Sequence, residues 1–162
     1  MLKDLLTSKK SSIVDNWVQL IVETYPSRTS GFLKSQKDRF SNPVGYTISD
    51  SAEKIFEDII NQNDIEKVKT SLTDLIKIRA VQNFSPSEAT GFIFSLKDVI
   101  RKELEQEVIE GNVLSELISV ESYIDNVGLA AFDVYMDARE KLFKIRINEL
   151  KSQVIYSKGI IE

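Results

Sequence analysis

The stretch Phe84-Ser85-Pro86-Ser87-Glu88-Ala89 carries the clearest helix start in the chain. Ser85 suits the N-cap, Pro86 occupies the favoured first helical position, and Glu88 completes a capping box three residues after the cap. This signal predicts a helix that runs from Pro86 to about Ile109.

Upstream of this stretch, apolar residues recur at the three- and four-residue spacing of amphipathic helices. The rhythm predicts helices over residues 12–25 and 47–61 and a third from Asn63 to about Gln82, with Asn63 as its cap. Residues 27–45 are polar and are broken by glycine and proline, which predicts a short helix and loops.

Downstream, Gly111-Asn112 is typical of a helix stop followed by a new start. The proline-free remainder is long for one globular helix, so we expect a break near residues 125–128 and a final helix from about Val127 to Tyr156. Its predicted apolar stripe is Leu129, Phe132, Tyr135, Met136, Leu142, Phe143, Ile147, Leu150 and Val154. Since no strand-like alternation occurs, the sequence predicts an all-α, single-domain bundle over residues 1–162, with its core at about 10–156, about six helices and a long C-terminal helix.

The composition excludes many functions. The 162 residues include no Cys and no His, which removes the commonest catalytic base and most zinc, iron–sulfur and haem ligands. Lys and Arg number 21 against 25 Asp and Glu, for a net charge of −4, the opposite of a nucleic-acid binder. We therefore expect a protein that is not an enzyme, with no cofactor, no metal and no nucleic-acid partner.

The sequence also argues against membrane insertion. Its longest apolar stretch, around Val127 to Phe132, is far shorter than the ~20 residues that span a bilayer. The N-terminus lacks the apolar core of a signal peptide. We expect a cytoplasmic protein.

A ligand pocket is one hypothesis for the aromatic residues. Trp17, Phe40, Tyr46 and Phe92 could line an apolar cavity, although aromatics at helical spacing usually form core. Arg79 continues an apolar helix face and could hold a carboxylate. Alternatively, Arg79 forms a structural ion pair or packs its stem on the core with its head in water.

Two further features each have a functional and a structural interpretation. Glu103 and Glu107, four residues apart on one predicted helix, could bind a metal or act as acid and base, but a solvated acidic face is the favoured interpretation. Gly91 lies inside a predicted helix, where glycine is unfavourable, so it either admits a close neighbour or is simply tolerated.

The final predicted helix carries more apolar surface than one small core needs. Phe132, Met136 and Phe143 occur beside basic residues on this helix. We expect a homodimer through these three residues.

Three blocks of sequence resemble a known family. They are Trp17 through Tyr25-Pro26, then residues 40–45, and the most specific one, Ile78-Arg79-Ala80-Val81-Gln82-Asn83 continuing through Ala89 to Leu96-Lys97. Together they resemble the N-terminal domain of the RsbR/RsbRD-type co-antagonists (RsbT co-antagonist family) of bacterial general-stress signalling, over roughly residues 10–150.

The resemblance implies a globin-like sensor or input domain without haem, usually dimeric through its terminal helices. In the wider family such a domain precedes a STAS domain, and we expect this chain to have no residues left for one. We therefore expect either a free-standing relative that acts through a partner protein or an input domain recruited to another pathway. The leading hypothesis is a non-catalytic regulatory module that binds a small molecule or a partner protein. The alternative is an apolar-cavity carrier of a small molecule such as a fatty acid.

Overall fold

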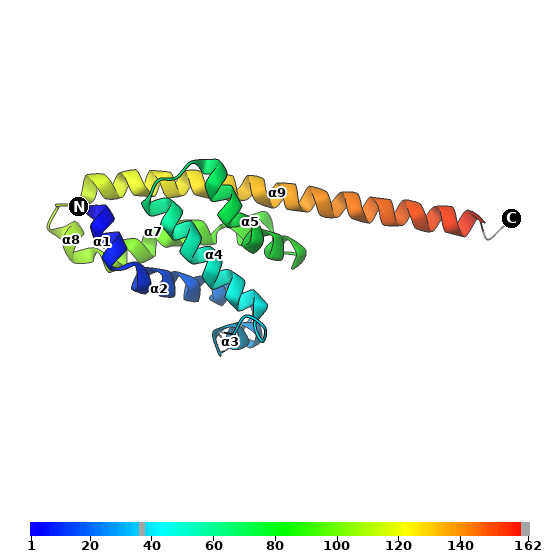
Figure 1. Ribbon diagram of the computed structural model, residues 1–162, viewed down its shortest axis with the longest axis horizontal. Coiled ribbons are helices and arrows are strands. Elements are labelled where there is room, and N and C mark those ends of the chain that lie inside the picture. The colour runs from blue at the N-terminus through cyan, green and yellow to red at the C-terminus, as the bar shows by residue number, and fades with distance from the viewer. Residues whose placement is uncertain (36–37, 160–162) are drawn as a thin grey trace.

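The computed structural model describes residues 1–35 and 38–159, and within these ranges the chain forms nine α-helices and no strand (Figure 1). Residues 36–37 and 160–162 of the predicted domain lie outside the described residues. The helices are α1 (Leu2–Ser8), α2 (Lys10–Glu23), α3 (Ser27–Ser35), α4 (Pro43–Ile60), α5 (Ile65–Val81), α6 (Pro86–Thr90), α7 (Phe92–Glu103), α8 (Glu105–Ile109) and α9 (Leu114–Gly159). The all-α prediction with a long C-terminal helix is confirmed.

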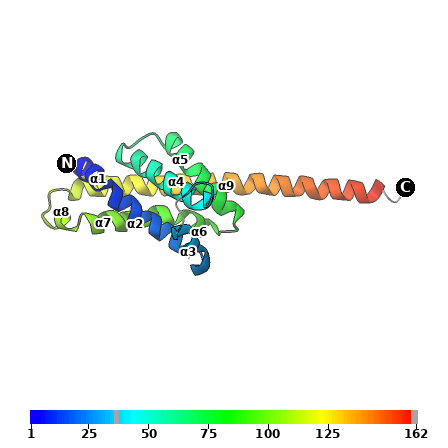
Figure 2. The ribbon, with the colours of Figure 1, turned by 60° about the horizontal axis from the view of Figure 1, so that its bottom comes forward.

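Helix α9 is the spine of the molecule. Its first half packs against α5, α6 and α7, while α4 joins α2 to α5 on the other side of the core. Its second half runs on alone beyond the body, as two views show (Figures 1 and 2). The core holds Trp17, Phe56, Leu72 and Leu75 with no exposed surface.

The continuous helix predicted over residues 86–109 is wrong, although its start is right. Ser85 and Glu88 form the predicted capping box. The chain then bends twice. At Gly91 the backbone tightens, because the N–H of Phe94 donates to the Gly91 carbonyl at 3.1 Å, a three-residue spacing. At Leu104 the backbone leaves the helical region with φ −110° while the side chain stays buried.

The break predicted near residues 125–128 is also wrong, because α9 continues through it. Gly128 faces the ring of Phe94 on α7, and a Cβ atom at Gly128 would fall 2.3 Å from the Phe94 Cζ atom. The glycine therefore provides close packing between two helices instead of a turn. The close approach that we considered at Gly91 involves only the backbone carbonyl of Ser87 in its own turn.

The starts of α1, α4 and α5 also differ from the prediction. Helix α1 was not predicted, and it is held by Leu2 and Leu6, which are buried one turn apart. Helix α4 begins at Pro43, where the Asn42 side chain accepts a hydrogen bond from the Gly45 N–H at 2.9 Å. The cap of α5 is Asp64, because Asn63 instead binds a buried carboxylate.

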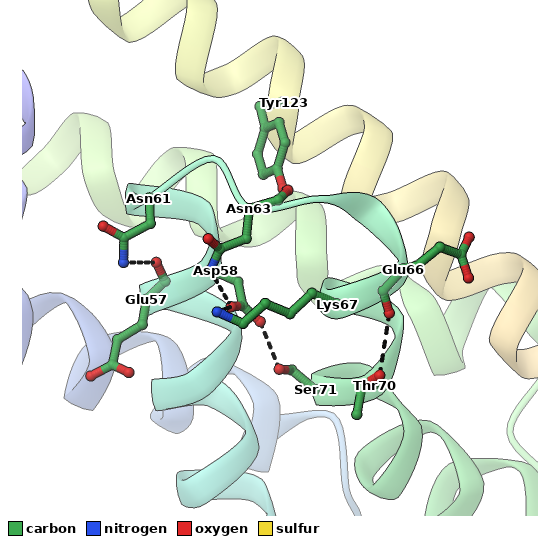
Figure 3. A network of polar contacts seen from close by, with 9 residues as sticks. All are labelled: Glu57, Asp58, Asn61, Asn63, Glu66, Lys67, Thr70, Ser71 and Tyr123. Carbon is green, nitrogen blue, oxygen red and sulfur yellow. Dashed lines mark hydrogen bonds and ion pairs between the residues drawn. The ribbon is translucent and has the colours of Figure 1, made fainter.

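That carboxylate, Asp58, organises the turn between α4 and α5 (Figure 3). It accepts hydrogen bonds from Asn63 Nδ2 and Ser71 Oγ, both at 2.6 Å, and lies 3.6 Å from Lys67 Nζ. The hydroxyl of Tyr123 on α9 donates to the Asn63 carbonyl. The network therefore connects the turn between α4 and α5 to helix α9.

We expect Asp58→Ala to lower the free energy of unfolding by about 2–3 kcal/mol, because the half-buried donors of Asn63 and Ser71 lose the buried carboxylate that accepts their hydrogen bonds. The neighbouring Glu57 is exposed and pairs with Lys10, so Glu57→Ala should cost less than about 1 kcal/mol. Urea denaturation measures both variants. Equal losses in the two variants would contradict this role for Asp58.

Candidate functional site

Arg79 is a fully buried cation near the end of α5. Its apolar neighbours on the helix, Leu72, Leu75 and Ile76, are buried as well, so the helix face that carries Arg79 is turned into the core. The guanidinium therefore enters the interior together with the apolar residues. Its position makes it the first candidate for a functional site.

The guanidinium bonds to three groups on other elements. Nη1 donates to the Glu88 carbonyl at 2.9 Å, and Nη2 donates to the Ile21 carbonyl at 3.2 Å and to Thr24 Oγ1 at 2.8 Å. Arg79 thus joins α5 to the end of α2 and to α6. Both structural alternatives considered for it are wrong: within the described residues it has no carboxylate partner, and its head is not in water.

Aromatic rings enclose the same guanidinium. The Arg79 Cζ atom lies 4.7 Å from the ring centre of Phe84, 5.1 Å from that of Phe92 and 5.2 Å from that of Tyr25. Ring faces attract cations, so the three rings compensate part of the lost hydration. Burial lowers the pKa of the Arg79 guanidinium. Trp17 extends the cluster, since its Nε1 donates to the Phe92 carbonyl at 2.8 Å.

Two polar atoms of this cluster lack hydrogen-bond partners within the described part of the chain: Tyr25 Oη and Arg79 Nε. Burial raises the pKa of the Tyr25 hydroxyl, and the charge of Arg79 opposes that rise. The Tyr25 ring therefore contributes packing and cation–π attraction, and its hydroxyl is held neutral.

We expect Tyr25→Phe to keep or slightly raise stability at pH 7, because the Tyr25 hydroxyl makes no hydrogen bond of normal geometry within the described residues and phenylalanine keeps the ring beside Arg79. A raised pKa in the folded state means that stability is present below the ordinary value of 10.0 and is lost as the pH rises above it. The variant should lack this alkaline component, whereas Tyr156→Phe, at an exposed site, should keep it. Thermal melts between pH 7 and 11 measure the effect. A loss above about 1 kcal/mol at pH 7 would contradict it.

The five residues predicted to line one pocket lie in two places. Trp17, Arg79 and Phe92 form the buried cluster. Phe40 is 91% exposed, and with the half-exposed Tyr46 it borders an open surface hollow at the start of α4. The guanidinium of Arg39 lies 5.4 Å from the Tyr46 ring centre in that hollow.

Glu103 and Glu107 fall on two helices, α7 and α8, so their predicted shared helix face is wrong. Glu103 accepts hydrogen bonds from Ser12 and Asn16 on α2, both at 2.8 Å. Glu107 pairs with Lys9 at 3.0 Å, and this hydrogen bond is the main cause that lowers the pKa of Glu107. Both carboxylates connect helices, and among the described residues no cluster of carboxylates suits a metal.

The second candidate site is the outward face of α9. The predicted interface residues Phe132, Met136 and Phe143 are 46%, 39% and 60% exposed. From Phe143 to Gly159, every described residue is exposed. The exposed apolar residues that share one face, here called the apolar seam, are Leu129, Phe132, Met136, Phe143, Ile147, Leu150 and Val154.

The sequence revealed this stripe but not its surroundings. Leu129, Ile147, Leu150 and Val154 were predicted to be apolar stripe residues, yet all four are exposed. Tyr135, from the same predicted stripe, is buried and donates to the Phe84 carbonyl at 2.6 Å. One sequence signal distinguishes the seam residues from Tyr135. The seam residues follow a spacing of three and four residues that continues along the projecting half of α9.

These observations define a class of protein: an all-α domain with a packed core that contains buried polar contacts, and one projecting helix whose apolar face is not covered by any of the described residues. The family model described as the RsbT co-antagonist protein rsbRD N-terminal domain matches residues 11–150. The chain therefore belongs to this family, which is one of regulatory signalling domains, and the resemblance drawn from the sequence blocks is confirmed.

A relative from Archaeoglobus fulgidus, described as an uncharacterized protein, is 22% identical over 159 residues, which cover 94% of this chain and 92% of the relative. No solved structure matches the chain. The described helices include none with the length and apolar character needed to cross a membrane.

Proposed function

We propose that the chain is a non-catalytic input domain of stress signalling that acts as a homodimer. It binds a small molecule or a partner protein and passes the signal on through the packing of α9. The observation that carries the proposal is the division of α9 into a half built into the core and a half that projects with an exposed apolar seam. The RsbRD family membership supports a regulatory role.

The body offers a route by which binding could reach α9. Arg79 joins α2, α5 and α6, and both α5 and α6 pack against α9. In addition, Arg139 of α9 donates to the Ala80 carbonyl of α5 at 3.0 Å. Because a helix is stiff along its length, a shift of its inner half would move the projecting half as well.

The carrier hypothesis is the weaker one. It needs space for a ligand carboxylate beside Arg79, but that side chain is fully buried and its terminal nitrogens are already bonded to protein groups. Nothing in the proposed role needs a cofactor, and we place the protein in the cytoplasm with other signalling domains of its family.

The test combines ligand screening with a distance measurement. Because the chain has no Cys, Ser157→Cys provides one spin label on the exposed part of α9. A small-molecule panel is screened for compounds that raise the melting temperature, and the label-to-label distance in the dimer is measured with each of them. A compound that changes both supports the proposal. Stabilising compounds that leave the distance and the dimer unchanged would contradict transmission through α9.

A further inference from the structure

The apolar seam of α9 is accompanied by a row of charged residues on one flank. The row consists of Asp133, Asp137, Glu140, Lys144, Lys151 and Lys158. Steps of three, four or seven residues keep the members on one side of the helix, as in the seam itself. The inner half of the row is acidic, and the projecting half is basic.

These charges are available for a partner. Within the described part of the chain, no member of the row forms a hydrogen bond or an ion pair through its charged group. The charges of Asp133 and Asp137 act on Lys69 of α5, whose pKa is raised first by its hydrogen bond to Glu66 and to a smaller extent by these two carboxylates. Lys69 itself pairs with Glu66 at 3.0 Å.

We propose that the apolar seam pairs with the seam of a second copy in the antiparallel direction. This inference rests on the dimer in the proposed function and adds the orientation and the contacts. With Met136 opposite Ile147 of the second copy, Leu129 falls opposite Val154, because both pairs step by seven residues in opposite directions. Apolar residues therefore meet apolar residues in these two pairs, while Phe143 falls opposite Glu140 and Leu150 opposite Asp133 of the second copy.

The charged row selects this orientation. In an antiparallel helix pair, equivalent flanks face each other, so Asp137 comes next to Lys144 of the second copy and Asp133 next to Lys151. Each contact occurs twice by symmetry. One like-charged contact remains, between Arg139 and Arg146, and it is weakened because Arg139 points to the Ala80 carbonyl.

A parallel pair would bring like charges together. Asp133 and Glu140, the members of the row that lie next to the seam, would face their own counterparts. In the parallel pair, the charged row of one copy would lie beside the other flank of the second copy's seam. Lys144 would then come next to Arg139, and Lys151 next to Arg146, of the second copy. Like charges at such positions are destabilising. The charge distribution therefore favours the antiparallel pair.

Cysteine cross-linking of the full chain separates the orientations, because the natural sequence has no thiol. We compare Leu129→Cys alone, Val154→Cys alone, and an equimolar mixture with one variant tagged. The two positions are roughly 38 Å apart along one helix, far beyond the reach of a disulfide. Under mild oxidation we expect disulfide-linked heterodimers in the mixture and none in either variant alone.

Each other outcome of the cross-linking experiment contradicts either the antiparallel orientation or the proposed dimer itself. Val154→Cys dimers without the other variant would overturn the antiparallel orientation but keep the proposed dimer. A wild-type dimer with no cross-link in any sample would place the interface elsewhere and overturn the inference. A wild-type protein that is monomeric would overturn both the inference and the proposed dimer.

Charge reversal provides a second readout. We expect Asp137→Lys and Lys144→Glu each to raise the dimer dissociation constant about tenfold, and the double variant to restore it. Lys141→Glu, at an exposed position away from the seam, is the matched control and should change it less than about twofold. Failure of the double variant to recover would contradict the Asp137–Lys144 contact.

Discussion

Arg79→Ala is expected to lower the free energy of unfolding by about 3–5 kcal/mol. The change removes three hydrogen bonds that connect three helices, leaves a space among Tyr25, Phe84 and Phe92, and removes their attraction for the cation. Many domains of this size have only ~5–15 kcal/mol of stability in total. Urea denaturation followed by circular dichroism measures the loss.

Arg79→Lys and Arg101→Ala are the controls for this prediction. Lysine keeps the charge but lacks the planar fork that reaches both Glu88 and Thr24, so we expect an intermediate loss. Arg101 is exposed and pairs with Glu121, so its replacement should cost less than about 1 kcal/mol. A loss of that small size for Arg79→Ala would show that the buried guanidinium does not hold the helices together.

Phe143→Asp is expected to raise the dimer dissociation constant at least about a hundredfold, because it places two desolvated carboxylates at the centre of the proposed interface. Phe143 is 60% exposed and is not one of the buried core residues, so the melting temperature of the single chain should change little. Sedimentation equilibrium measures the dissociation constant.

Ile145→Asp is the matched control for Phe143→Asp. Ile145 is exposed to a similar extent but points away from the apolar seam, on the side of α9 where it borders a surface hollow with Asn148 and Tyr156. We expect it to leave the dimer intact. If Ile145→Asp dissociates the dimer and Phe143→Asp does not, the interface lies on the opposite face of the helix.

Local signals in the sequence predicted much of the fold. The capping box at Ser85, the amphipathic rhythm and the positions of the prolines yielded the all-α class and most helix boundaries within a few residues. These features act between residues close in sequence, and the sequence shows them directly. The long C-terminal helix was predicted for the same reason.

The errors came from contacts between distant residues. Gly128 suggests a turn in the sequence, but the ring of Phe94 fills the space above it. Asn63 has the character of a cap, but Asp58 and Tyr123 take its polar groups. The continuity of α9 and the start of α5 depend on these tertiary contacts, which no local pattern contains.

The candidate sites were predicted in part for a similar reason. The apolar spacing revealed Phe132, Met136 and Phe143, since periodicity is local. The partners of Arg79 lie on α2 and α6, and the exposure of Phe40 depends on how the start of α4 sits on the body. Separating a buried cluster from a surface hollow therefore required the three-dimensional arrangement.

Native mass spectrometry of the purified full chain tests the central claim most directly, because it reports how many copies assemble and whether any ligand is retained. The account predicts a species with twice the 18.4 kDa mass of the chain, which Phe143→Asp converts to the single-chain mass. A wild-type protein that shows only the single-chain mass at micromolar concentration would contradict it.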